Sequence, residues 1–197
     1  KYPNYFSHEG KEYTINTKLI GNHFISNITG AIALAKKNGI SIEQSLNSIE
    51  HFVGVKRRTE FIGKFNGVNF YDDYGHHPTE IKATTKALKE STVGNLIVIF
   101  QPHRFTRTKD HLEDLKNSFN YSDLTLITDI YSAGEKPIPG ISSLLFEGDG
   151  IKYIKSPRMV PHYVKTNIKP GDTVLTIGAG DITLLGPQIL KYLNETK

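Results

Sequence analysis

From residue 57 onward, hydrophobic positions alternate between short β-prone runs and longer runs with helical spacing. Two of the short runs, residues 96–100 and 173–177, are almost continuously apolar, which is typical of strands buried on both faces. We expect strands near residues 59–64, 67–72, 95–100, 123–128, 151–155 and 173–177, helices near 78–90, 108–119, 157–167 and 182–193, and a weaker helical turn at 141–146. This βαβα order predicts an α/β fold, with a Rossmann-like, mainly parallel sheet covered by helices on both faces.

The first part of the chain has a different pattern. Residues 11–20 are β-prone and partly alternate, so we expect a strand there. Apolar residues then recur at helical spacing up to Asn38-Gly39, a typical helix end, and Ser41 is a typical N-cap for a second helix. We therefore expect two domains, residues 1–54 and residues 55–197.

Composition narrows the class of protein. The 197 residues are 38% hydrophobic and 22% charged, which is typical of a soluble globular protein. A net charge of +4 favours anionic partners, but no block of Lys and Arg indicates nucleic acid. The chain has no Cys, and its apolar runs are too short to span a membrane, so we expect a cytoplasmic protein. Because the chain opens at Lys1 without Met, we also expect it to be part of a longer protein.

The first candidate for chemistry is the polar turn between the strand at 67–72 and the helix at 78–90. It carries Asp73, Tyr74, His76 and His77, and Pro78 suits the first helical position. Free N–H groups at a helix start, next to two histidines, favour an anionic ligand. A metal site is less favoured because adjacent histidines point in different directions, and an ordinary capped helix start is the structural alternative.

A second polar turn, residues 101–108, follows the strand at 95–100. Its Arg104 and Arg107 can each grip a carboxylate or a phosphate with a bidentate fork, and His103 lies beside them. A solvated basic turn is the alternative. Because the carboxyl ends of parallel strands meet at one edge, we expect this turn and the first one to converge on one ligand.

Three further segments have weaker signals. His23 and Asn27 are four residues apart at a helix start and could flank a nucleobase, although capping and packing are equally consistent with the pattern. Arg58, with its neighbour Arg57, could reach a phosphate between two domains or could be ordinary surface charge. The glycine turn at residues 178–182 lacks a full dinucleotide-binding pattern, so we interpret it as close packing of a turn.

Taken together, these motifs resemble those of the Mur ligases. The matching segments cover nearly the whole chain in order: Gly21-Asn22-His23 with Asn27, Phe52-Val53-Gly54-Val55-Lys56-Arg57-Arg58, Asp72-Asp73-Tyr74-Gly75-His76-His77-Pro78-Thr79-Glu80, Gln101-Pro102-His103-Arg104-Phe105-Thr106-Arg107, Asp129-Ile130-Tyr131-Ser132-Ala133-Gly134-Glu135 and Gly178-Ala179-Gly180-Asp181-Ile182. One departure is Phe24, where the family usually has Asn. The resemblance is to the carboxyl-terminal domain, residues 55–197, preceded by the tail of the ATP-binding domain, residues 1–54.

The resemblance implies an ATP-dependent ligase of peptidoglycan synthesis. Its cofactors would be ATP and Mg²⁺, with most Mg²⁺ ligands and the phosphate loop in a missing amino-terminal part, and no metal ligands in this chain. Its substrates would be UDP-N-acetylmuramate and L-alanine, joined through an acyl phosphate. The chain alone would therefore fold but not catalyse, and its partners would be the other domains of the same protein.

The resemblance also implies residue roles. His23, Asn27, Arg58 and Asp73 would contact the nucleotide. His76, Arg104 and Arg107 would be catalytic. The same three residues, together with Tyr74, His77 and His103, would bind the muramate carboxylate and the incoming amino acid.

Two alternatives remain open. One is a murein peptide ligase, which joins the same nucleotide sugar to a recycled peptide and differs in the turn that contains Arg104 and Arg107. The other is a stand-alone α/β module that binds an anion or a nucleotide without catalysis. An upstream phosphate loop in the same reading frame would exclude the second alternative.

Overall fold

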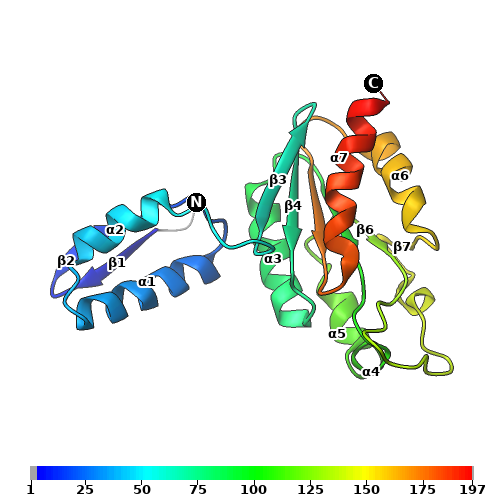
Figure 1. The fold of residues 1–197 in the computed structure, drawn as a ribbon, viewed down its shortest axis with the longest axis horizontal. Helices are drawn as coiled ribbons and strands as arrows, with labels where there is room; N and C mark the ends of the chain where they lie inside the picture. The colour runs from blue at the N-terminus through cyan, green and yellow to red at the C-terminus, as the bar shows by residue number, and fades with distance from the viewer. Residues whose placement is uncertain (1–3, 197) are drawn as a thin grey trace. The chain divides into compact units, whose positions relative to one another are not determined.

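The computed structural model describes residues 4–196, drawn as a ribbon in Figure 1. The chain divides into two compact units, residues 1–55 and 56–197. The first unit is a small α/β element with its own apolar cluster, and the second contains a six-stranded sheet.

The first unit consists of a hairpin and two helices. Strands β1 (Tyr5–His8) and β2 (Lys11–Thr14) pair antiparallel, and helices α1 (Asn22–Lys37) and α2 (Ile42–His51) follow. A cluster of buried isoleucines, Ile15, Ile28, Ile32 and Ile42, holds these elements together.

Local signals at the helix ends of this unit are confirmed. Helix α1 ends at Lys37 with Asn38 as its C-cap, and Gly39 follows with φ of 87°, a left-handed conformation that glycine adopts without a Cβ penalty. Ser41 caps α2 through a reciprocal pair of hydrogen bonds with Gln44. The strand expected at residues 11–20 is only partly correct, because the extended pairing stops at Thr14 and β1 is its partner.

The second unit contains a sheet with the strand order β3-β4-β8-β5-β6-β7. Strand β3 is antiparallel to β4, and the other neighbours are parallel. The strands are β3 (Glu60–Phe65), β4 (Val68–Asp73), β5 (Leu96–Phe100), β6 (Leu124–Ile127), β7 (Ile151–Tyr153) and β8 (Thr173–Ile177). The expected α/β fold with a mainly parallel sheet is confirmed.

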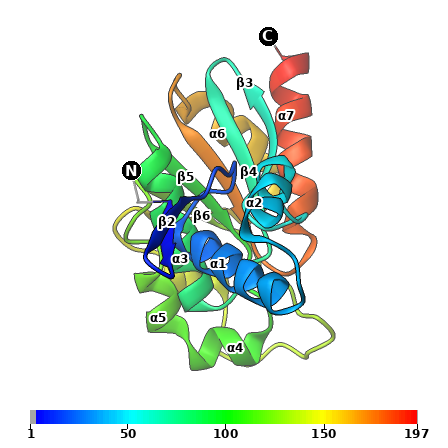
Figure 2. The ribbon, with the colours of Figure 1, turned by 90° about the vertical axis from the view of Figure 1, so that its left-hand side faces the viewer.

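Helices cover both faces of this sheet (Figure 2). Helices α3 and α5 pack on one face, while α7 packs on the other and α6 packs against α7. The helices are α3 (Pro78–Ser91), α4 (Phe105–Asp110), α5 (Leu112–Asn117), α6 (Val160–Asn167) and α7 (Leu185–Glu195), with short 3₁₀ turns η1 (Ser143–Phe146), η2 (Pro157–Met159) and η3 (Asp181–Leu184). Strands β5 and β8 are buried along their whole length, as their continuous apolar runs predict.

One expected helix is wrong in detail. Residues 108–119 do not form a single helix, because α4 begins earlier and is separated from α5 at His111. His111 has φ of −123°, outside the helical range, and this backbone angle separates the two helices. Arg104, with φ of 72°, starts α4 directly after the turn that follows β5.

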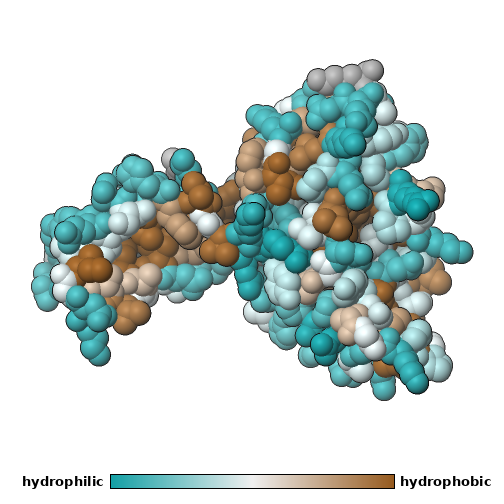
Figure 3. All heavy atoms as spheres, viewed as in Figure 1, coloured by the Kyte–Doolittle hydropathy of each residue, from teal (hydrophilic) through white to brown (hydrophobic). Residues whose placement is uncertain are grey.

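Apolar side chains lie inside the second unit and polar ones cover it. Phe100 is fully buried and contacts the rings of Phe119 and Phe146, at centroid distances of 5.1 and 6.1 Å. On the face shown in Figure 3, hydrophobic residues of this unit are scattered among hydrophilic ones. Among residues 4–196, no helix combines the length and the apolar character that a membrane span requires.

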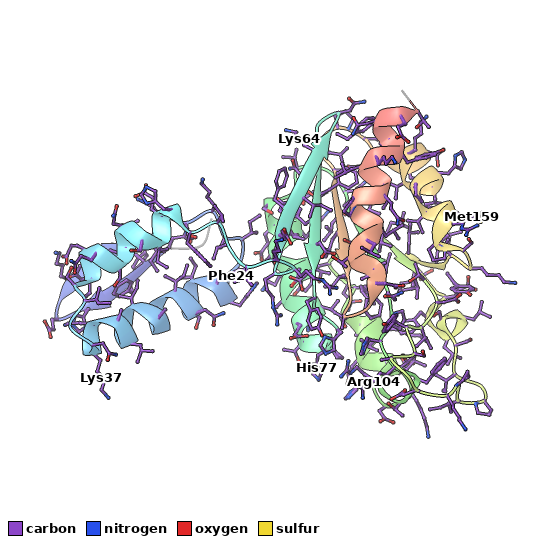
Figure 4. The ribbon with its side chains drawn as sticks, in the orientation of Figure 1. Phe24, Lys37, Lys64, His77, Arg104 and Met159 are labelled. Atoms are coloured by element: carbon purple, nitrogen blue, oxygen red, sulfur yellow. The ribbon has the colours of Figure 1, made fainter. Side chains whose placement is uncertain are left out.

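The topology brings three polar turns to one edge of the sheet. Strand β8 lies between β4 and β5, and all three run parallel, so the segments that follow them emerge side by side. Figure 4 shows His77 and Arg104, which follow β4 and β5, at this edge, whereas Lys64 lies at the opposite edge. We call this edge the carboxyl edge of the sheet.

Candidate functional site

The turn after β4 is built around a buried carboxylate. Oδ2 of Asp73 accepts hydrogen bonds from the backbone N–H of Thr59 at 2.7 Å and from the Thr59 hydroxyl at 3.2 Å, and Oδ1 accepts the N–H of Gly75 at 2.7 Å. Burial raises the pKa of Asp73, and these hydrogen bonds oppose that rise only in part. Asp73 is 3% exposed and anchors the turn from inside, and its expected contact with the nucleotide stays a prediction.

In the same turn, the side chains of His77 and Glu80 accept hydrogen bonds from backbone N–H groups at the start of helix α3. The ring of His77 accepts the N–H of Thr79 at 3.3 Å, and Pro78 occupies the first turn, as expected. Glu80 accepts the backbone N–H groups of His76 at 3.1 Å and His77 at 3.2 Å. The helix is therefore well capped, and Oε2 of Glu80 also lies 3.7 Å from Nδ1 of His76.

His76 points toward the turn that follows β5. Its Nδ1 lies 3.1 Å from the carbonyl oxygen of Tyr74, which can only accept, so Nδ1 carries the proton and Nε2 is the acceptor in the neutral ring. The ring packs edge-on against Tyr74 at 5.3 Å and lies 5.8 Å from the ring of His103. The first and second polar turns therefore meet, as the sequence predicts.

His103 and Arg107 form the other side of this meeting point. The His103 ring stacks on Tyr131 at 5.6 Å, and its Nδ1 lies 3.4 Å from Nη1 of Arg107, so Nδ1 accepts and Nε2 carries the proton. Burial, followed by the positive charge of Arg107, lowers the pKa of His103. We call His76, His103 and Arg107 the carboxyl-edge cluster.

Arg104 lies beside this cluster, and the loop that follows β6 holds its backbone in place. The N–H of Arg104 donates to the carbonyl of Tyr131 at 2.8 Å, and the N–H of Tyr131 donates to Pro102 at 2.8 Å. Glu135 accepts the hydroxyl of Thr106 at 2.7 Å and its N–H at 3.1 Å, which caps the start of α4. The Arg104 side chain is exposed and free to meet a ligand.

The glycine turn after β8 supports this arrangement through packing. A Cβ at Gly180 would lie 2.3 Å from Oε1 of Gln101 and 2.7 Å from Cγ of Tyr131, and a Cβ at Gly178 would lie 2.8 Å from the Gln101 carbonyl. These distances are shorter than any real contact of a Cβ. The two glycines therefore make room for Gln101 and for the ring that stacks on His103, in agreement with the interpretation as close packing.

Arg57 and Arg58 have different surroundings although they are neighbours. Arg57 donates to the carbonyls of Gly178 at 2.6 Å and Gly180 at 3.3 Å, and its Nε lies 3.4 Å from the buried carboxylate of Asp72. Arg57 thereby joins the start of β3 to the glycine turn. Arg58 is exposed, and its Nη1 lies 3.6 Å from Oε1 of Glu80.

Some expected site residues are not part of the cluster. The His77 ring packs against His111 at 5.5 Å, so the two adjacent histidines point in different directions. His77 caps α3 in this structure and its side chain is exposed, and its expected contact with the substrate stays a prediction. His23 and Asn27 belong to α1 of the first unit, where His23 packs against Phe24 at 4.3 Å and Asn27 is exposed.

The lowered pKa of His103 gives a direct prediction. In this chain we expect His103 to titrate below 6.5, and we expect Arg107→Gln to raise its pKa because a neighbouring positive charge is lost. NMR titration of the imidazole protons measures both values, with Lys109→Gln on the exposed side of α4 as the control. A His whose pKa is lower in the folded state than in the unfolded chain binds a proton more readily in the unfolded chain. The free energy of unfolding therefore decreases as the pH falls through the pKa of the unfolded state. Titration of His103 at or above 6.5 would contradict the burial and charge described here.

The same prediction extends to stability. His103→Asn should reduce the loss of folding free energy between about pH 7 and pH 5, because Asn binds no proton in this range. Denaturant unfolding at both pH values measures the difference, and an unchanged loss would show that other groups control the acid stability.

Comparisons with known proteins support the family resemblance. Residues 57–180 match the family described as Mur ligase, glutamate ligase domain. The chain is 39% identical over 182 residues to the UDP-N-acetylmuramate–L-alanine ligase of Desulforamulus reducens, covering 89% of this chain and 39% of that protein. It thus spans about two fifths of the length of this relative.

Solved structures agree on the fold. The UDP-N-acetylmuramate–alanine ligase of Thermotoga maritima superposes with a TM-score of 0.78 at 23% identity, covering 95% of this chain and 42% of that one. The MurF ligase of the same organism, solved in complex with ADP, gives a TM-score of 0.75 at 16% identity and covers 98% of this chain and 46% of that one. Because the matched family segment includes both polar turns and extends over more than half of the residues, the chain belongs to the Mur ligase family.

Proposed function

We propose that this chain is the carboxyl-terminal part of an ATP-dependent ligase that joins L-alanine to UDP-N-acetylmuramate through an acyl phosphate. The observation that carries the proposal is the meeting of His76, His103 and Arg107 at the carboxyl edge of the sheet. The relative from Desulforamulus reducens bears the name of this activity. In this proposal residues 1–54 are the tail of the ATP-binding domain and residues 55–197 are the ligase domain.

Two arginines supply fixed positive charge at the proposed site. Arg107 is half-buried, with Nη1 held by His103, so its guanidinium loses little freedom when it grips a carboxylate or a phosphate. Arg104 is exposed beside it and can hold a second anionic group. ATP, when bound, supplies the phosphoryl group that activates the muramate carboxylate. The arginines then orient that carboxylate and oppose the charge that develops on it.

The two histidines have complementary roles in the proposal. Nε2 of neutral His76 is an acceptor and can take a proton from the amine of L-alanine as this amine attacks the activated carbonyl. Nε2 of His103 is a donor and can hold an anionic oxygen. Tyr74, which packs against the His76 ring, borders the same site.

The nucleotide would contact a different set of residues. Arg58 is exposed and fits a phosphate, while His23 and Asn27 are proposed for the adenine on the first unit. Asp73 is proposed to contact the nucleotide from the carboxyl-terminal side, and its two oxygens also accept hydrogen bonds from Thr59 and Gly75 in the turn. Among residues 4–196, no three His, Asp or Glu side chains gather to hold a metal ion, and we propose that the Mg²⁺ ligands belong to other parts of the full-length protein.

Phosphate release by the full-length protein tests the proposal. With ATP and UDP-N-acetylmuramate present, we expect release to depend on L-alanine, and we expect no release from the 197-residue chain alone. A peptide that stimulates release in place of L-alanine would identify a murein peptide ligase instead. Release that responds to neither acceptor would contradict the proposed activity.

A further inference from the structure

Glu80 contacts two parts of the site with its two carboxylate oxygens. Oε2 accepts the backbone N–H groups of His76 at 3.1 Å and His77 at 3.2 Å, and therefore fixes the first polar turn. Oε1 lies 3.6 Å from Nη1 of Arg58, the exposed arginine that precedes β3. One carboxylate thus holds the turn that carries His76 and the arginine that faces a phosphate.

A second capping box in the chain shows that a neutral side chain can cap a helix, so capping alone does not need the negative charge of Glu80. At the start of α2, Gln44 accepts the N–H of Ser41 at 3.0 Å with a neutral amide oxygen, and the Ser41 hydroxyl accepts the N–H of Gln44 at 3.1 Å. Glu80 occupies the equivalent position in α3. Its negative charge is therefore available for neighbouring cations.

The surroundings of Glu80 contain two such cations. Arg58 lies at Oε1, and Nδ1 of His76, when that ring is protonated, lies 3.7 Å from Oε2. Burial alone would raise the pKa of Glu80, but the N–H groups of His76 and His77 and the nearby cations lower it overall, so the group stays ionised. The side chains of Glu80 and Arg58 are 37% and 46% exposed, so their ion pair adds little to stability and chiefly fixes position.

We propose that Glu80 is a positioning residue that couples the phosphate-facing Arg58 to the carboxylate-facing His76. The inference rests on the proposed function, because it assigns a role between the two groups that this function brings together. Glu80 itself does not touch the reacting atoms. It fixes the positions of Arg58 and His76, which do.

The test uses Glu80→Gln in the full-length ligase. The amide oxygen can still accept hydrogen bonds from the N–H groups of His76 and His77. The amide NH₂ group then faces Arg58, and because both groups are donors they form no hydrogen bond with each other. We expect kcat/KM for ATP to fall by about threefold to fivefold with an unchanged melting temperature, on the scale of one weakened charge contact. Glu80→Ala removes the cap as well and should lower both quantities. Gln44→Ala is the matched control: it removes the other capping box and should lower the melting temperature while leaving kcat/KM for ATP unchanged.

The coupling itself is measured in an Arg58→Gln background. There, Glu80→Gln should change kcat/KM for ATP by less than about twofold, because the partner is already absent. An equal effect in both backgrounds, wild-type kinetics in Glu80→Gln, or equal losses of melting temperature in Glu80→Gln and Glu80→Ala would each overturn the inference. Absence of L-alanine-dependent phosphate release in the unmutated protein would instead refute the proposed function, so the two failures are distinct.

Discussion

Replacing Arg107 with Ala in the full-length protein should lower ligase turnover at least about tenfold while leaving the protein folded. The guanidinium is half-buried and its Nη1 lies 3.4 Å from Nδ1 of His103, so it is held ready for an anionic group. Loss of one charge-assisted contact costs roughly 1.5–3 kcal/mol, which corresponds to a factor of about ten or more in rate. Amino-acid-dependent phosphate release measures the turnover, and circular dichroism reports the fold.

Lys109→Ala is the matched control for this variant. Lys109 lies on the same short helix and is exposed, so its removal takes away one positive charge and leaves the cluster intact. We expect turnover close to that of the unmutated protein. An Arg107→Ala enzyme with an unchanged rate would remove Arg107 from the proposed site.

Gly180→Ala should reduce both stability and turnover. The φ of Gly180 is −88°, outside the left-handed region, and the expected effect follows from the space around an added Cβ. The added Cβ would meet Cγ of Tyr131 at 2.7 Å, near the fixed root of that side chain, and Oε1 of Gln101 at 2.3 Å. Overpacking of this kind costs about 1–3 kcal/mol. Displacement of the Tyr131 ring would also move His103, and we expect turnover to fall at least about tenfold.

Gly148→Ala serves as the control for added volume. A Cβ at Gly148 would have only one neighbour, the carbonyl oxygen of Phe146 at 4.0 Å, so the substitution should change little. Thermal unfolding and phosphate release measure the two effects. Normal stability and turnover in Gly180→Ala would show that Tyr131 and Gln101 do not hold the site in place.

Much of the fold follows from local pattern. The continuous apolar runs locate β5 and β8, and Pro78 and Ser41 locate the starts of two helices. Strand β1 has no such signal, because it is a short exposed strand whose extended form depends on pairing with β2. The division between α4 and α5 is also hidden, since it comes from the backbone conformation of His111 in its tertiary setting.

The site could be predicted only in part. Polar turns after parallel strands predict that the segments around His76 and Arg107 meet, and the structure brings them together. Sequence does not show which way a side chain points, so it does not reveal that the His77 ring caps α3 or that Asp73 is buried inside its turn.

The other contacts in the site that the sequence could not predict join residues far apart along the chain. The stacking of Tyr131 on His103 and the contact of Glu80 with Arg58 join residues 28 and 22 positions apart, beyond the range of local patterns. Glu80 lies in the first turn after Pro78, a position that indicates a helix start and gives no sign of the neighbouring arginine.

A crystal structure of the full-length protein with UDP-N-acetylmuramate and a non-hydrolysable ATP analogue tests the central claim most directly. The proposal requires the muramate carboxylate to lie at the carboxyl edge of the sheet, within about 3.5 Å of the Arg107 guanidinium and next to His76 and His103. A muramate carboxylate bound elsewhere, with the cluster of His76, His103 and Arg107 facing only solvent, would contradict it.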